Sequence, residues 1–420
     1  MDRKTISAWA AYDWASTAVN AIVFTFVFSV YFVKSVYGDE VAGSAAWSYA
    51  QGWAGVVIAV CSPILGAAID RYGPHKPVLK FLTVAGAALT AGLYFVEPQA
   101  SSVVMALVLG AVLTIIFEFI QNIYNSTLGL VAKPADMGRV SGIGWGFGYF
   151  GSIVCLVIVL LLFIGLGNKG GLLGITKDGA QHVRMAMVFT GLWFAVFAIP
   201  YFAYCPDAPR ESITFRQSVI AAIGDCKAMV REARAYPEIL KFLAASAVYR
   251  DALATLFAVG GLYAAGTLHM GFSEVMIFAI AMNVASGVGA LAFSFLDHRI
   301  GAKVTVMVSL VGLVLFGTGV LLTSDKTMFI ALACAMGLFI GPVQASSRTM
   351  LAQMAPPEKL GSFFGIYSMT GKAVSFVGPF AFAALTSAFD SQRAGIASIL
   401  AFWIIGLMMV YFVKPNTRSA

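Results

Sequence analysis

Charge is scarce in this sequence. Asp, Glu, Lys and Arg make up 11% of its 420 residues, against roughly 25% in an average soluble domain. Cysteine and histidine are also rare, and the four histidines are isolated from one another. The five cysteines show no paired spacing, at Cys61, Cys155, Cys205, Cys226 and Cys334. These spacings predict neither a disulfide framework nor a zinc site, and we expect no metal and no cofactor.

Sequence signals of an enzyme, of nucleic-acid binding and of a cleaved leader are missing as well. The glycine-rich run "GIGWGFG", residues 142–148, lies inside an apolar stretch and follows no strand, so it does not predict a phosphate loop. The net charge of +7 comes from basic residues scattered over many loops, whereas a nucleic-acid footprint needs them clustered on one face. The apolar stretch Trp9–Phe32 is too long for a signal peptide, and no small-residue cleavage pattern follows it.

Hydrophobic residues make up 60% of the chain, and they are gathered in long runs. A run of about 20 apolar residues is long enough to cross a bilayer as a helix. Twelve such runs are present, at 7–33, 47–69, 78–97, 101–131, 139–166, 183–204, 239–266, 272–296, 304–323, 327–353, 361–388 and 394–413. The sequence therefore predicts an all-α integral membrane protein with twelve transmembrane helices, in contact with the lipid bilayer.

Basic residues are unevenly divided between the two sides of this map. Of the 27 Lys and Arg residues, 18 fall on the side of the termini, 6 on the other side and 3 within the membrane. Because cytoplasmic loops carry the excess of Lys and Arg, we expect both termini in the cytoplasm. The expected location is the inner (plasma) membrane of a bacterium.

The twelve segments divide into two related halves. Residues 205–238 form the longest polar interval, with apolar and charged faces typical of a surface helix. This interval separates a bundle at 1–204 from a bundle at 239–420. A shift of 223 residues places Gln121 on Gln344 and Gly142 on Gly365. Such a repeat predicts two pseudo-symmetric six-helix bundles with a substrate site between them, near the middle of the membrane.

Two loops at corresponding places carry a common motif. The sequence "GAAIDRYGPHK" spans residues 66–76 and "FSFLDHRIGAK" spans residues 293–303. Both resemble the G-x-x-x-D-R-x-G-x-x-K signature of the major facilitator superfamily, although the second copy lacks the first glycine and has an inserted histidine. Charged residues at such helix ends can pair with the neighbouring bundle, and glycine permits the tight turn. The gating residues we predict are Asp70, Arg71, Gly73, Asp297 and Arg299.

Longer motifs narrow the resemblance. The segments "AAYDWAST", "FEFIQNIYNSTL", "GRVSGIGWGFGYFGS" and "SQRAGI" resemble the bacterial branch of the major facilitator family that contains the fungal autophagy-linked vacuolar amino-acid effluxer. The resemblance runs from Trp9 to about Ile396. It implies the major facilitator fold and secondary transport, and it says little about the substrate.

Ionisable residues inside the membrane are costly and normally face a cavity or a partner. Six fall within the predicted helices, namely Asp13, Glu118, Arg250, Asp251, Arg348 and Lys372. Asp13 and Asn20 share one helix face, and so do Glu118, Asn122 and Asn125. Arg250 and Asp251 are adjacent and point about 100° apart, so they cannot pair with each other. Structural alternatives stay open for three of them. Asp13 could snorkel or bond to backbone near the start of the eleventh segment, Glu118 could form a fixed ion pair or be a buried protonated hydrogen bonder, and Arg348 could close an ion pair with Glu358.

The leading hypothesis is a monomeric secondary transporter for a small polar, amino-acid-like solute, coupled to protons or another ion and working by alternating access. The predicted substrate-binding residues are Asn20, Asn122, Asn125, Tyr149, Gln344, Arg348 and Lys372, and the predicted proton-coupling residues are Asp13, Glu118 and Asp251. An exporter of amphipathic compounds or lipids is the nearer alternative, because the segments are rich in Phe, Met and Trp. A membrane enzyme and a receptor are further alternatives.

Overall fold

The computed structural model describes residues 3–132, 137–166, 170–209, 215–356 and 360–414. Twelve helices in this part of the chain are long and apolar enough to cross a membrane, as the sequence predicted. The first half contains α1 (Arg3–Val19), η1 (Asn20–Phe26), α2 (Phe28–Tyr31), η2 (Phe32–Tyr37), α3 (Glu40–Tyr72), α4 (Lys76–Gly92), η3 (Leu93–Phe95), η4 (Ala100–Ser102), α5 (Val103–Ser126), α6 (Leu128–Val131), α7 (Met137–Ile158), η6 (Val159–Ile164), η7 (Asp178–Ala180) and α8 (Gln181–Tyr204).

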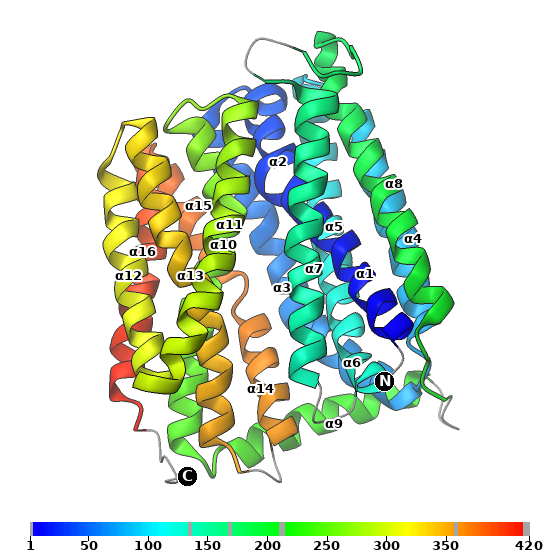
Figure 1. Ribbon diagram of the computed structural model, residues 1–420, viewed down its shortest axis with the longest axis vertical. Coiled ribbons are helices and arrows are strands. Elements are labelled where there is room, and N and C mark those ends of the chain that lie inside the picture. Colours follow the sequence, from blue (N-terminus) through cyan, green and yellow to red (C-terminus); the bar gives the residue numbers. More distant parts are fainter. Residues whose placement is uncertain (1–2, 133–136, 167–169, 210–214, 357–359, 415–420) are drawn as a thin grey trace.

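A linker helix and a second set of spanning helices follow. The linker helix is α9 (Phe215–Ala233), and the second half contains α10 (Pro237–Gly266), α11 (Phe272–Ile300), α12 (Ala302–Leu322), α13 (Lys326–Met354), α14 (Leu360–Ala373), α15 (Val377–Phe389) and α16 (Gln392–Phe412). Figure 1 shows α9 lying across one end of both bundles, on the side where the chain begins and ends. We call this end the linker side and the other end the opposite side.

The two halves repeat one packing plan. In the first bundle α1 packs along α8, α4 along α8, and α3 along α5. In the second bundle α10 packs along α16, α12 along α16, and α11 along α13, which are the corresponding pairs. The bundles meet where α15 lies along α3. The predicted pair of pseudo-symmetric six-helix bundles is therefore confirmed.

The first transmembrane segment is not the continuous α-helix that we expected over 7–33. It changes to π-helix at Asn20–Phe26 and again at Phe32–Tyr37. A π-turn widens the helix and leaves it irregular, and such turns often occur at functional sites. Between Ala8 and Val36, all of which the structure describes, Asn20 is the single residue with an exposed side chain. Its neighbours along this segment are covered by other helices, so Asn20 is the accessible point of this segment.

The eleventh segment is also interrupted, at residues 374–376 between α14 and α15. Pro379 in the first turn of α15 has no N–H group, so it cannot carry a helical hydrogen bond back across the break. Asp251 of α10 reaches the start of α15 and accepts a hydrogen bond from the Gly378 backbone N–H at 2.6 Å. A carboxylate at a helix N-terminus satisfies a free N–H and complements the helix dipole.

Glycines let α7 approach α1 closely. A Cβ atom at Gly151 would lie 2.6 Å from the Trp14 carbonyl oxygen, and one at Gly148 would lie 2.6 Å from Thr17 Oγ1. Gly144 packs against Trp9 in the same way, whereas a Cβ atom at Gly142 or Gly146 would meet nothing within 4 Å. Gly144, Gly148 and Gly151 thus form the close contact between α7 and α1.

This difference predicts opposite effects for two matched substitutions on α7. Gly151→Ala should lower the melting temperature of the detergent-solubilised protein by several degrees, because the methyl group collides with backbone and overpacking costs about 1–3 kcal/mol. Gly146→Ala should leave it unchanged or raise it, since alanine is the better helix former. Equal melting temperatures for the two variants would contradict this packing.

Candidate transport site

An ion pair joins the two bundles. The Lys372 ammonium of α14 contacts the Glu118 carboxylate of α5, and the two side chains are 28% and 25% exposed. From the sequence we predicted that Lys372 binds substrate and that Glu118 couples protons, without pairing the two residues. The structure brings them together as opposite charges on different bundles. Any motion that separates α14 from α5 must break this contact.

Arg348 and Tyr149 lie on different bundles. The Arg348 side chain on α13 is exposed, and its charge acts electrostatically on the Tyr149 hydroxyl of α7. Trp145 lies one turn away on α7, with its ring centroid 5.9 Å from that of Tyr149. Gln344, one turn before Arg348, is half-buried. The alternative partner Glu358 lies outside the described residues.

The two asparagines predicted on α5 have different surroundings. The Asn122 amide donates to the Ser62 carbonyl oxygen at 2.9 Å and to its hydroxyl at 3.0 Å, so it binds α3 within its own bundle. Asn125 is exposed, and its side-chain oxygen accepts a hydrogen bond from Gln121 at 3.2 Å. Asn125 is therefore available to a solute, whereas the Asn122 amide is already used in packing α3 against α5.

Asp13 lies inside the first bundle. It is 7% exposed, and its Oδ2 atom accepts a hydrogen bond from the Tyr124 hydroxyl at 3.0 Å. Tyr124 in turn stacks on Trp9 and Tyr12, with ring centroids 4.5 Å and 5.0 Å apart. This contact ties α1 to α5. The tyrosine partner lies within the motif "FEFIQNIYNSTL", but no spacing rule pairs two residues that are 111 positions apart.

Arg250 and Asp251 bind different helices, in agreement with the prediction that neighbours on a helix cannot pair. Arg250 donates to the Tyr367 carbonyl oxygen at 3.0 Å, and its guanidinium group lies 4.0 Å from the centre of the Tyr367 ring. Asp251 is 4% exposed and holds the start of α15 through Gly378. Both charges therefore connect α10 to the interrupted eleventh segment.

The predicted gating loops form the expected turns. Gly73 has a φ of 101° and Gly301 has a φ of 85°, values that strongly favour glycine. The motif lysines cap helix ends at equivalent places in the two halves: Lys76 donates to the Phe202 carbonyl oxygen at 3.0 Å, and Lys303 donates to that of Val413 at 2.8 Å. A cation at a helix C-terminus is stabilising, so these lysines hold each loop to the last helix of its own bundle.

The charged gating residues are less completely described. Arg71 is exposed at the end of α3. The side chains of Asp70, Asp297 and Arg299 lie outside the described part of the chain. Their gating role stays a prediction.

The fold is shared with several solved transporters. A D-xylose–proton symporter superposes with a TM-score of 0.71 at 12% identity, covering 99% of this chain and 98% of that one. A bacterial homologue of the human lysosomal transporter Spinster gives 0.65 at 14% identity, covering 98% and 95%. Two related six-helix bundles, as in these structures, are the fold of the major facilitator superfamily.

Comparison of sequences places the chain within this superfamily. The chain belongs to the family described as "Vacuole effluxer Atg22 like", which it matches over residues 29–419. It is 24% identical to the uncharacterised MFS-type transporter YxiO of Bacillus subtilis, over 99% of this chain and 96% of that protein. It is also 24% identical to autophagy-related protein 22 of Cryptococcus neoformans, over 67% of this chain and 50% of the fungal protein. The match thus spans about half the length of the fungal relative.

Proposed function

We propose that this secondary transporter carries a small zwitterionic solute of the amino-acid type and that it couples transport to protons. The observation that carries the proposal is the ion pair between Lys372 and Glu118, which joins the two bundles and stays partly exposed. Asn20, Asn125 and Arg348 are exposed on η1, α5 and α13 and provide polar groups for the same solute. A site with cations on the second bundle and a carboxylate on the first suits a molecule that has both charges.

Coupling follows from competition for Lys372. While Glu118 is ionised, its carboxylate is paired with the Lys372 ammonium group. A proton on Glu118 removes that charge and frees Lys372 for the carboxylate of a solute. When the bundles move and the proton leaves, Glu118 regains its charge and displaces the solute. Exchange of one carboxylate for another needs no uncompensated buried charge, which would be costly.

We also propose that the linker side is cytoplasmic, because 18 of the 27 basic residues lie there. The native Cys205 is a poor reporter of sidedness, since burial raises the pKa of its thiol to about 12. In a variant without the native cysteines, Leu172→Cys on the opposite side should react with a membrane-impermeant maleimide in intact bacteria. Gln217→Cys on α9 should react only after the cells are opened. The reverse pattern would invert the orientation.

Counterflow in proteoliposomes tests the transport proposal. Vesicles loaded with an unlabelled mixture of the standard amino acids should accumulate the same mixture in radiolabelled form. Parallel vesicles loaded with sugars, nucleosides or an amphipathic dye should not accumulate the labelled form of the compound that they contain. An imposed proton gradient should increase the accumulation of the amino acids. Glu118→Gln should keep counterflow and lower the gradient-driven accumulation at least about tenfold, because each tenfold step reflects about 1.4 kcal/mol of lost coupling.

Asp251→Asn is the matched control for Glu118→Gln. Its amide oxygen can still accept the Gly378 N–H, so accumulation should continue to follow the gradient. If Glu118→Gln accumulates solute as the parent does, Glu118 is not the coupling residue. Counterflow of the dye alone would favour the exporter of amphipathic compounds.

Beside Lys372, we propose that Arg348 also holds the carboxylate of the solute, because its guanidinium can form two parallel hydrogen bonds where the Lys372 ammonium offers a point charge. Arg348→Lys should weaken inhibition of counterflow by the amino-acid mixture by roughly tenfold to 150-fold, the equivalent of about 1.5–3 kcal/mol. Arg250→Lys, on a residue bound to Tyr367, should leave the inhibition constant near that of the parent. Amines without a carboxylate should inhibit the parent and Arg348→Lys equally. Parent-like inhibition of Arg348→Lys by the intact amino acids would remove Arg348 from the site.

A further inference from the structure

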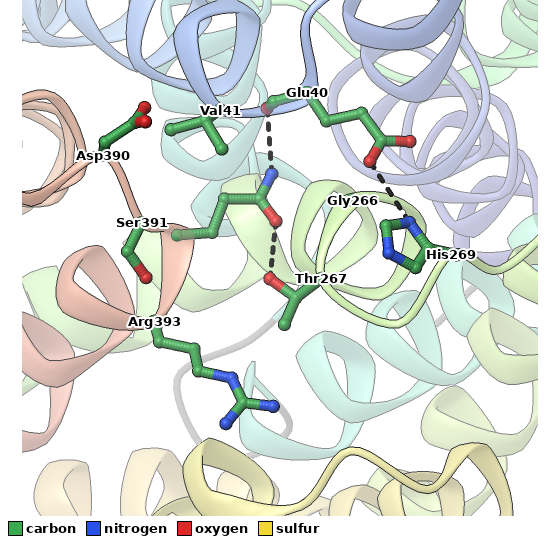
Figure 2. A pocket seen from close by; sticks show the side chains of 9 residues that line it. Glu40, Val41, Gly266, Thr267, His269, Asp390, Ser391 and Arg393 are labelled. Carbon is green, nitrogen blue, oxygen red and sulfur yellow. Dashed lines mark hydrogen bonds and ion pairs between the residues drawn. The ribbon is translucent and has the colours of Figure 1, made fainter.

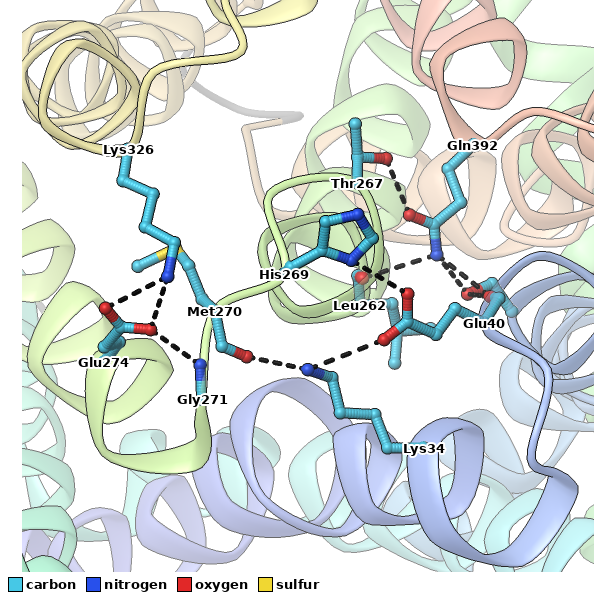
Figure 3. Close-up of polar contacts among 11 residues, drawn as sticks. Lys34, Glu40, Leu262, Thr267, His269, Met270, Gly271, Glu274, Lys326 and Gln392 are labelled. Atoms are coloured by element: carbon cyan, nitrogen blue, oxygen red, sulfur yellow. Dashed lines mark hydrogen bonds and ion pairs between the residues drawn. The ribbon is translucent and has the colours of Figure 1, made fainter. Parts of the chain in front are cut away.

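The two bundles are joined on the opposite side by a polar network (Figure 3). Gln392, at the start of α16, donates to the Glu40 backbone carbonyl oxygen at 3.0 Å and to Ser44 Oγ at 2.6 Å, both on α3. From the first bundle, Lys34 donates to the Met270 carbonyl oxygen at 2.8 Å. His269 Nδ1 lies 3.4 Å from a Glu40 carboxylate oxygen. All four contacts cross from one bundle to the other.

Gln392 is the centre of this network. Gln392 is 3% exposed, and its side-chain oxygen accepts a hydrogen bond from the Thr267 hydroxyl at 2.8 Å. The last residue of α10 is Gly266, where a Cβ atom would lie 2.5 Å from both polar atoms of the amide. The missing side chain at Gly266 thus makes room for Gln392. A buried amide whose donors and acceptor are all used is costly to disrupt, because separated groups lose their partners.

The Glu40 carboxylate lies at the edge of the same network. It contacts Lys34 at 3.5 Å and His269 at 3.4 Å. The His269 side chain is 80% exposed, and its backbone φ is 50°, in the left-handed region. Figure 2 shows Glu40 and His269 lining a pocket together with Asp390 and Arg393. The volume of this pocket is about 240 Å³. Solvent on the opposite side therefore reaches the contact between His269 and Glu40.

We propose that Gln392 and Glu40 form the lock that keeps the opposite side closed, and that His269 makes the lock sensitive to protons on that side. A proton on the His269 imidazole turns its contact with the Glu40 carboxylate into an ion pair between bundles. The lock then holds more firmly. Opening requires Gln392 to leave the Glu40 carbonyl and Ser44 hydroxyl, and His269 to leave the Glu40 carboxylate.

Histidine is the side chain whose charge normally changes between pH 5 and 8. The other charged groups near the lock are Lys34, Asp39, Glu274, Lys326, Asp390 and Arg393, all of types that normally keep their charge over that range. Two of these groups satisfy each other, since Lys326 donates to Glu274 at 2.9 Å. Arg393 is held by the Thr323 carbonyl oxygen at 3.0 Å. His269 is therefore the residue of this network that belongs to a type whose charge changes between pH 5 and 8.

This inference rests on alternating access and not on the identity of the solute. Its test uses no solute, so a failure of the amino-acid proposal would leave the result readable. The full chain without its native cysteines receives nitroxide labels at Ala100→Cys and Met328→Cys, exposed positions on the opposite side of the first and second bundle. Pulsed electron–electron double resonance in nanodiscs then measures the distance between the two labels at pH 7.5 and pH 5.5.

We expect the ratio of the short-distance population to the long-distance population to be about 1.5-fold to fivefold higher at pH 5.5 than at pH 7.5. This is the effect that an exposed ion pair normally has on an equilibrium. His269→Asn should abolish this response while keeping the backbone, since asparagine tolerates positive φ. Glu40→Gln should abolish it too, although the Glu40 carbonyl contact with Gln392 remains. A pH response that persists in His269→Asn would overturn the role of His269.

The lock itself is tested at Gln392. Gln392→Glu places a carboxylate against the Glu40 carbonyl oxygen, so it should shift the equilibrium at least about tenfold toward long distances at both pH values. Gly266→Ala displaces the amide without changing it and should shift the equilibrium in the same direction. This second variant decides the question if the first does not fold. Parent-like distances in Gly266→Ala and in any folded Gln392→Glu would overturn the lock.

Discussion

An ionised side chain inside a membrane must find a partner on another helix, and this constraint organises the polar interior of the transporter. Asp13 accepts a hydrogen bond from Tyr124, Asp251 holds the start of α15, and Arg250 binds the carbonyl group and ring of Tyr367. Each of these partners lies within the same bundle. Lys372 and Glu118 instead belong to different bundles. Their contact is therefore the one in this set that motion between the bundles must break.

The two interrupted segments place irregular backbone at the interface between the bundles. The π-helix at Asn20–Phe26 packs against α10, where a Cβ atom at Gly261 would lie 2.0 Å from the Thr25 carbonyl oxygen. The break between α14 and α15 lies against α3, where a Cβ atom at Gly55 would lie 2.9 Å from Phe376. Non-helical backbone is tolerated at membrane depth where protein or water covers it. Both breaks occur in segments that carry proposed site residues, Asn20 and Lys372.

The two ends of the interface use different chemistry. On the linker side, Lys76 and Lys303 bind helix ends within their own bundles, which leaves each loop free to move with its bundle. On the opposite side, Gln392 and Lys34 bind backbone carbonyl groups of the other bundle. The structure thus holds the opposite side closed by contacts that cross the interface. With exposed side chains at Asn125 and Arg348, this arrangement suits a state in which the site is reached from the linker side.

Much of the architecture could be predicted from the sequence, because the bilayer imposes length and hydrophobicity on each segment separately. The twelve spans, the two-bundle repeat, the glycine turn at Gly73 and the separate partners of Arg250 and Asp251 all follow from local pattern and helix geometry. The breaks in the first and eleventh segments were missed. Pro379 was a usable signal for the second break, whereas the apolar run through Asn20 gave no local sign of a π-helix.

Which charges pair was decided by the tertiary structure. Glu118 and Lys372 are 254 positions apart, and Gln392 lies more than 300 positions from Ser44, so no periodicity links them. A sequence identifies a buried charge through its cost in an apolar segment, since that cost depends on the residue and its depth alone. The partner depends on how the helices and the two bundles are positioned against each other. The position of the bundles placed Lys372 on Glu118 and closed the opposite side through Gln392. The packing of α3 on α5 within the first bundle turned the Asn122 amide toward Ser62.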